Sequence, residues 1–205
     1  FTPAAYYSEI LVSAENLVMG AASVEGALPD LFAGSFADAQ HFGMMTGDGT
    51  MAGLYTNGTL TWDENCAAPG APTWTDFVNF AGALKVRSFN PIIITSPGFI
   101  SNLLLSTAAS HEGLKMELLT KGSIRGVPVH EDFYAGTTNV ADDVVAVGMD
   151  PKNYVIAMAR ELQIEPIRAP GTAGVYFQAT AFFDGGVILA ANGAQLKAVQ
   201  VWQLI

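Results

Sequence analysis

A long amphipathic helix followed by a sharp turn is the feature that most constrains this fold. Pro29 suits a first helical turn, where its missing N–H costs nothing, and Asp30 adds negative charge near the positive end of the dipole. Gly47 and Gly49 end the pattern, because glycine readily leaves right-handed helical geometry. The sequence therefore predicts a helix over residues 29–46. Its predicted buried stripe, at three- and four-residue spacing, is Leu28, Phe32, Phe36, Ala39 and Phe42, extended by Met44 and Met45.

Asp48 lies between the two glycines, in the run Gly47-Asp48-Gly49-Thr50. An acid flanked by glycines also occurs in phosphate- and calcium-binding loops, but no P-loop lysine follows and the EF-hand spacing is absent. We therefore predict a turn residue whose carboxylate accepts hydrogen bonds from nearby backbone N–H groups.

Charge is distributed unevenly along the chain, whose formal net charge is −10. No Lys or Arg precedes Lys85, whereas nine acids do, so the first 84 residues carry −9. A block of one sign repels itself unless cations arrive from a neighbouring subunit or from residues before Phe1. A plainly acidic surface that keeps the protein soluble is an equally open interpretation. Either way, the chain lacks the basic stripe that binds phosphates, which argues against direct nucleic-acid binding.

Composition indicates an ordered protein of one large domain or two intimate ones. Half of the 205 residues are hydrophobic and 14% are charged, so a sizeable core can be buried. Cys66 is the only cysteine, which excludes a disulfide framework and a CxxC motif and fits a reducing interior. No apolar run reaches the roughly 18 residues of a membrane helix, so no membrane association is predicted.

The remaining pattern predicts an α+β protein with a mixed sheet. Three further helices are expected: a short one capped by Ser13 and ended by Gly20, one capped by Thr73 or Thr75, and one that starts at Ser96. The second should bury Phe77, Phe80, Ala81 and Leu84; the third should bury Phe99, Ile100, Leu103, Leu104 and Leu105 and end at His111-Glu112-Gly113. Strands are predicted at 1–12, 59–62, 91–95, 127–129, 144–148, 154–157, 162–164, 175–179, 187–189 and 199–201.

No residue pattern in the sequence predicts a catalytic, cofactor-binding or metal-binding site. His41, His111 and His130 are widely spaced, and His41 is predicted to be a packed or interface histidine. His111 is expected at a helix end, where the dipole favours positive charge. His130-Glu131-Asp132 could suggest a metal site, but sequence neighbours on a strand point different ways. Asp142-Asp143 is typical of a solvated turn, and no G-x-S-x-G elbow occurs. We therefore predict no catalytic, cofactor-binding or metal-binding residue, and no enzyme activity.

An ordered set of short motifs resembles the major capsid proteins of tailed bacteriophages of the Hong Kong 97 type. The predicted helix with its Gly-Asp-Gly-Thr turn is similar to the spine helix of that family. Later motifs follow in the same order along the chain: Ile93–Pro97 leading into a helix, Gly126–Val129, Val145–Asp150 before Tyr154–Ala157, and Phe177–Asp184 before Val187–Ala194.

The resemblance implies a Hong Kong 97-type capsid fold with two parts. Residues 1–12 would be the remnant of an extended loop. Residues 13–71 and 172–189 would form a peripheral domain with its spine helix at 29–46, and 72–171 with 190–205 would form an axial domain. The chain would then be a truncated form without the N-terminal arm and most of the extended loop. Cross-linking between subunits cannot be argued, since no lysine precedes Lys85.

The implied function is that of a structural subunit of a phage or prophage icosahedral capsid. Such a subunit assembles with itself into pentamers and hexamers that enclose the DNA genome, in the cytoplasm of the bacterial host. Scaffolding, portal and decoration proteins and a maturation protease are further expected partners. Two alternatives stay open: the shell protein of an encapsulin-type bacterial compartment, and a small α+β hydrolase or sugar-binding domain.

Overall fold

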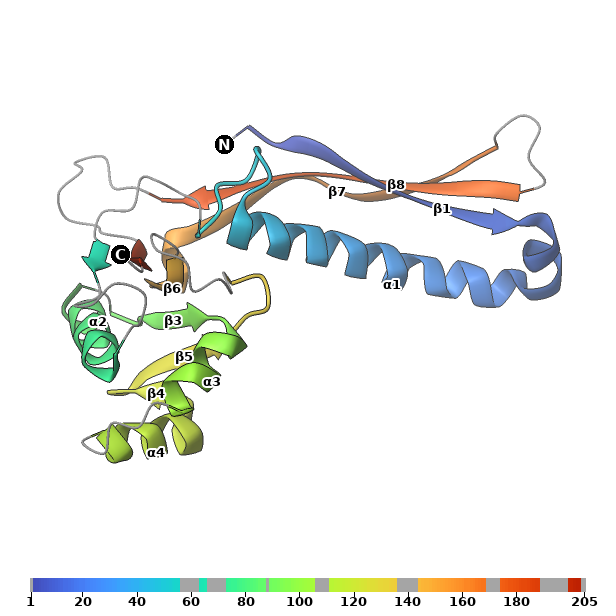
Figure 1. Cartoon of the computed structure of the whole chain (residues 1–205). Helices are drawn as coiled ribbons and strands as arrows, with labels where there is room; N and C mark the ends of the chain where they lie inside the picture. Colours follow the sequence, from blue (N-terminus) through green and yellow to red (C-terminus); the bar gives the residue numbers. More distant parts are fainter. Residues whose placement is uncertain are drawn as a thin grey trace.

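Two sheets and one long helix divide the molecule into an arm and a body (Figure 1). The computed structural model describes residues 2–55, 63–65, 73–87, 89–105, 111–135, 144–168, 174–188 and 199–203. The arm consists of β1 (Ala4–Ser13), α1 (Ala14–Thr46), β7 (Tyr154–Ile167) and β8 (Gly174–Val187). All other elements form the body, and the short 3-10 turn η2 (Pro151–Asn153) leads from the body into β7.

The arm is a three-stranded antiparallel sheet with α1 along one face (Figure 1). Its strand order is β1-β8-β7, and β1 is paired with β8 over its whole length, from Ala4 opposite Phe183 to Ser13 opposite Gly174. Side chains alternate between the two faces, as a strand requires. The inner face contributes Ala179, Ala181 and Phe183 to the core against α1. The expectation of an extended segment at residues 1–12 is thus confirmed for the described part, as a strand.

The expected break between a short first helix and the long helix is wrong. α1 is one helix of 33 residues, about 50 Å at 1.5 Å per residue, and Pro29 lies inside it. An internal proline removes one backbone hydrogen bond and crowds the preceding turn. Pro29 is exposed, so water can replace the missing bond on that side of the helix, while Leu28 beside it is buried against the arm. Tertiary packing therefore overrides the local stop signals at Gly20 and Pro29.

The predicted end of the long helix and most of its stripe are confirmed. α1 ends at Thr46, and Gly47, with a φ of 76°, donates its N–H to the Gly43 carbonyl at 2.9 Å. Leu28, Phe32 and Phe36 are buried. Phe42, expected in the same stripe, is instead 43% exposed. At about 100° per residue it lies at the flank of the stripe, whereas Gly43 lies within it. Met45 lies on another side of the helix and is buried in the core that α1 shares with β6.

The body is built on a six-stranded mixed sheet in the order β2-β9-β6-β3-β5-β4, which confirms the predicted α+β class. The two central strands, β6 and β3, are antiparallel, and β3 is parallel to β5. Its strands are β2 (Asp63–Asn65), β3 (Ile92–Thr95), β4 (Ser123–Ile124), β5 (Val127–Glu131), β6 (Val144–Met149) and β9 (Val199–Gln203). Its helices are α2 (Trp74–Arg87), α3 (Pro97–Leu105) and α4 (Glu112–Lys121).

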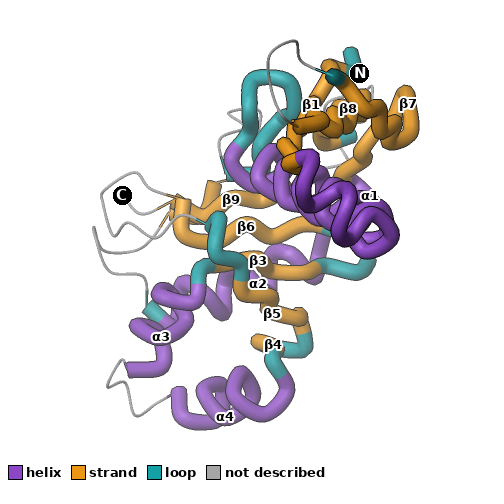
Figure 2. Tube along the Cα trace, turned by 90° about the vertical axis from the view of Figure 1, so that its right-hand side faces the viewer, coloured by secondary structure: helices purple, strands orange, loops and turns teal. Residues whose placement is uncertain are grey.

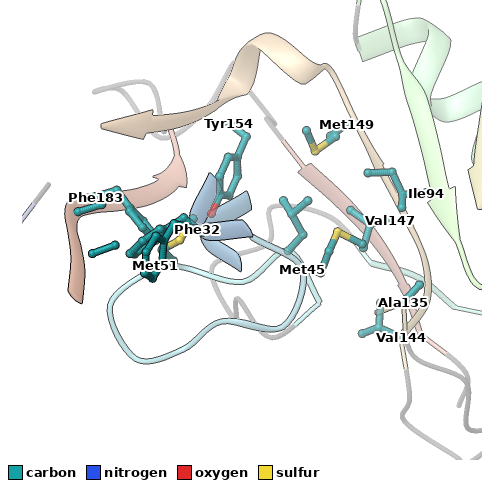
Figure 3. Packing of buried hydrophobic residues seen from close by; sticks show 14 of the residues in the cluster. Phe32, Met45, Met51, Ile94, Ala135, Val144, Val147, Met149, Tyr154 and Phe183 are labelled. Carbon is teal, nitrogen blue, oxygen red and sulfur yellow. The ribbon is translucent and has the colours of Figure 1, made fainter. Parts of the chain in front are cut away.

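Each face of the body sheet packs into a different core. Ile93 lies in the core with α2, α3 and α4, whereas its neighbour Ile94 lies in the core shared with α1 and the arm sheet. Figure 3 shows this shared core running from Phe183 to the side chains of β3 and β6. On the α2 side, a Cβ added to Gly148 would lie 2.3 Å from Leu84, so only glycine permits this close approach of helix and strand.

The predicted start of α2 is confirmed at Thr73 rather than Thr75. The Thr73 backbone N–H and hydroxyl both donate to the Asp76 carboxylate, at 2.9 and 2.7 Å, in a reciprocal capping arrangement. Ser96 caps α3 through the N–H of Phe99, at 3.2 Å. The buried faces hold the expected residues: Phe77, Phe80, Ala81 and Leu84 in α2, and Phe99, Ile100 and Leu103 in α3.

Four expectations about element boundaries and burial are wrong. No separate strand begins at Val187, because Val187 is the last residue of β8 and Ile188 lies outside the strand. His111-Glu112-Gly113 begins α4 instead of ending the preceding helix, and Gly122, in the left-handed region, ends α4. Leu105, the last residue of α3, is 78% exposed, because at about 100° per residue it lies on the opposite side of the helix from Phe99 and Leu103. The separate strands expected at 154–157 and 162–164 are one continuous strand, β7, interrupted only by register shifts between Met158 and Gln163. The strand expected at 59–62 lies outside the described residues.

We predict that Pro29→Ala stabilises the protein. Alanine restores the missing N–H inside α1, while it also makes the unfolded chain more flexible. The net increase in the free energy of unfolding should be about 1–2 kcal/mol. Urea denaturation followed by circular dichroism measures it. No change or a loss of stability would instead indicate a helix that begins at Pro29.

Candidate functional site

The outer face of the arm sheet carries ordered rows of side chains. Strand register places directly paired residues on the same face, and Tyr7 and Leu11 on this face are 71% and 54% exposed. One row runs Glu9, Gln178, Glu165 across β1, β8 and β7. The adjacent row runs Leu11, Tyr176, Ile167. An acidic row thus borders an apolar row on a face that no described element covers.

A basic corner lies on the body where α2 meets the turn between β4 and β5. We define it as Lys85, Val86, Phe89 and Arg125. A Cβ on Gly126 would lie 3.2 Å from the Lys85 ammonium, and one on Gly82 would lie 3.0 Å from the Arg125 guanidinium, so helix and turn are in contact here. Val86 follows Lys85 in α2, Phe89 lies just after α2, and both side chains are almost fully exposed. Arg125 itself has a φ of 51°, which belongs to the tight two-residue turn that presents it.

The junction of arm and body holds an ion pair. His41 of α1 contacts the Asp132 carboxylate, from the segment that follows β5. Two residues further along, the Tyr134 hydroxyl donates to Asp38 of α1 at 2.8 Å, and this bond raises the pKa of Tyr134. Phe133 packs edge-on against His41 with ring centres 5.6 Å apart. We call these five residues the elbow; they tie α1 to the body.

Asp48 has the structural role that its sequence context predicts. Its carboxylate accepts the backbone N–H groups of Thr50 and Met51, at 2.9 and 2.7 Å, and the hydroxyl of Tyr6 from β1. Partial burial alone would raise the pKa of Asp48, but these hydrogen bonds outweigh it and lower the pKa below its usual value. Burial, together with the bond to Asp48, raises the pKa of Tyr6 to about 12, so the hydroxyl stays protonated as a donor.

The three histidines lie apart, and each is in a structural setting. His41 is an interface histidine within the chain, at the elbow, in accord with its prediction. His111 precedes α4, at the helix end opposite to the one expected. His130 and Glu131 are exposed on β5. Asp132 instead contacts His41, which lies 91 residues away in the sequence. Asp142 and Asp143 lie outside the described residues. Within the described ranges, no three His, Cys, Asp or Glu side chains gather as metal ligands.

Sequence reasoning missed the acidic row, the basic corner and the elbow. Each joins residues far apart in the chain, and the rows depend on a strand register that local patterns do not fix. One signal pointed toward them: acids crowd the first 84 residues, whereas every Lys and Arg lies later.

Comparison with known proteins identifies the family. The phage capsid family matches residues 1–195. The chain belongs to the phage capsid family. No curated protein sequence matches. It is a structural protein, a major capsid subunit that forms part of a virion capsid.

Solved structures share its fold. The capsid of a native GTA particle is 18% identical with a TM-score of 0.75, over 98% of this chain and 72% of that one. A chain from Mycobacterium phage Che8 is 15% identical with a TM-score of 0.58, over 97% and 70%. The SrpI encapsulin of Synechococcus elongatus PCC 7942 is 12% identical with a TM-score of 0.66, over 99% and 74%. The expected Hong Kong 97-type fold is thereby confirmed.

We predict that Asp48→Asn destabilises the subunit in a pH-dependent way. Loss of the charge weakens three hydrogen bonds and should cost about 1 kcal/mol at pH 7. Because the folded pKa is lowered, the contribution of Asp48 is present above the unfolded value, near 3.9, and is lost as the pH falls through the folded value. The difference between variant and wild type should therefore shrink below about pH 4.

Urea denaturation at pH 7 and pH 3.5 measures this difference. Asp30→Asn, which removes an exposed carboxylate from α1, is the matched control and should change little at either pH. A cost of Asp48→Asn that is the same at both pH values would contradict the assignment.

Proposed function

We propose that this capsid subunit assembles with copies of itself into pentamers and hexamers that enclose a phage or prophage DNA genome. The observation that carries the proposal is the match of the phage capsid family over residues 1–195, on a fold with a long arm and a compact body. A plate with an extended arm can contact several neighbours at once, which closed shells require. Assembly would take place in the cytoplasm of the bacterial host.

The expected two-domain division becomes a proposal with three adjustments. Residues 4–13 join the peripheral domain because β1 is paired with β8, and residues 63–65 join the axial domain because β2 belongs to the body sheet. The peripheral domain would comprise the arm, and the axial domain the body. Since β7 is paired with β8 along most of its length, residues 154–168 belong with the arm in this proposal, although the sequence grouped them with the axial domain. The turn at residues 47–55 would join the two, because Leu54 and Tyr55 donate their N–H groups to Met44 and Met45 at the end of α1.

We further propose that the subunit acts without catalysis, a cofactor or a metal. Its role would be to form part of a shell, and the polar groups described above would stabilise turns and the junction of arm and body. Scaffolding, portal and decoration proteins and a maturation protease are proposed as further partners. No helix in the part of the chain that the structure describes could span a membrane.

An encapsulin-type compartment is the second candidate, because an encapsulin shares the fold with a TM-score of 0.66. The two candidates differ in what the shell encloses. Particles purified from the native host would contain nuclease-protected DNA in the first case and a packaged enzyme in the second.

We predict that the full-length gene product forms closed shells of uniform size when it is expressed with its scaffolding and protease genes. Negative-stain electron microscopy and sedimentation measure the outcome. Subunits that stay monomeric under every assembly condition would contradict the proposal.

A further inference from the structure

We propose that the acidic row on the arm of one subunit binds the basic corner on the body of a second copy. The contact rests on the proposed self-assembly and adds to it a specific pair of surfaces. The acidic surface is Glu9, Gln178 and Glu165 with the bordering row Leu11, Tyr176 and Ile167. The basic surface is the corner of Lys85, Val86, Phe89 and Arg125.

The acidic surface holds two carboxylates of like charge close together. Glu9 and Glu165 flank Gln178 on either side, so their strands lie about 10 Å apart at 4.8 Å per strand. Both side chains are exposed, and Gln163 donates a hydrogen bond to Glu165. Among the described residues, neither Glu9 nor Glu165 forms an ion pair.

Other charges on β7 limit the acidic surface. Arg160 is paired with Phe182, two rows from the acids, and Arg168 directly follows the strand. Glu161, the next residue along β7, is also exposed. A cationic partner must therefore approach from the β1 side, near Glu9 and Leu11, because both arginines belong to the β7 side of the face.

The basic surface matches this pattern. Lys85 and Arg125 are exposed and adjacent, and two exposed apolar residues, Val86 and Phe89, follow Lys85 in the sequence. Glu117 lies close, but it accepts the Gly126 N–H at 2.8 Å and so faces the turn backbone; this bond lowers the pKa of Glu117. Exposed Lys121 at the end of α4 offsets its charge. In the proposed contact, Lys85 and Arg125 of one copy therefore face Glu9 and Glu165 of another, and both surfaces also carry exposed apolar residues.

The two surfaces of one chain cannot meet each other. Figures 1 and 2 both place α1 between the arm sheet and the turn of β4 and β5. The contact must therefore join different copies, arm to body. Because it uses different patches on the two partners, it is heterologous, and repeated copies generate a ring or a continuing lattice.

A charge exchange in the full-length protein tests the pairing. Glu9→Lys with Glu165→Lys, and separately Lys85→Glu with Arg125→Glu, should each lower the assembled fraction at least about tenfold, because like charges then face each other. All four substitutions together should restore assembly. Glu15→Lys with Asp30→Lys changes the net charge equally on exposed positions of α1 and should leave assembly unchanged. Circular dichroism confirms that each variant folds.

The outcomes separate this inference from the proposed function. A wild-type protein that never assembles overturns the proposed function. The pairing alone is overturned if the wild type assembles and the two double variants assemble equally well. It is also overturned if the variant with all four substitutions folds but does not recover assembly. Wild-type assembly should also weaken as salt is raised from 0.05 to about 0.5 M, since exposed charges are then screened.

Discussion

The packing of α1 against the inner face of the arm sheet is the interaction on which the rest of the structure depends. Phe32 is fully buried there, as is Phe183 on β8. A helix of 33 residues with an internal proline would not persist in water by propensity alone, because most helical stability in proteins comes from a packed apolar face. The sheet in turn needs the helix, since an isolated three-stranded sheet leaves one apolar face in water.

The same core continues into the body and fixes the angle of the arm. Met45 and Met51 belong to it, together with Val147 and Met149 of β6. The Tyr55 hydroxyl donates to the Ile94 carbonyl at 2.9 Å, and the Ala52 N–H donates to Gly185 at 2.9 Å. These two bonds join the segment after α1 to β3 and β8, and the elbow joins α1 itself to the segment after β5.

Local chemistry allowed part of this fold to be predicted from sequence. The end of α1 at Gly47, the turn role of Asp48, the Thr73 cap and the buried strands β3 and β6 each follow from a few adjacent residues. The extension of α1 through Pro29 could not be predicted, because it depends on a sheet whose strands come mainly from residues beyond 150. Likewise, Asp132 lies in a run that suggested a metal site, and only the fold brings it to His41. The candidate surfaces depend on register and tertiary contact in the same way, so unequal charge along the chain was their only sequence signal.

The central claim is that a continuous arm, anchored in the body, presents its outer sheet face to a neighbouring copy. A cryo-electron microscopy map of assembled particles, at a resolution that traces side chains, tests it most directly. The account predicts unbroken helical density from Ala14 to Thr46 and a neighbour's α2 and β4–β5 turn seated on the row of Glu9 and Glu165. A helix broken at Pro29, or an outer face that meets only solvent in every subunit of the shell, would contradict it.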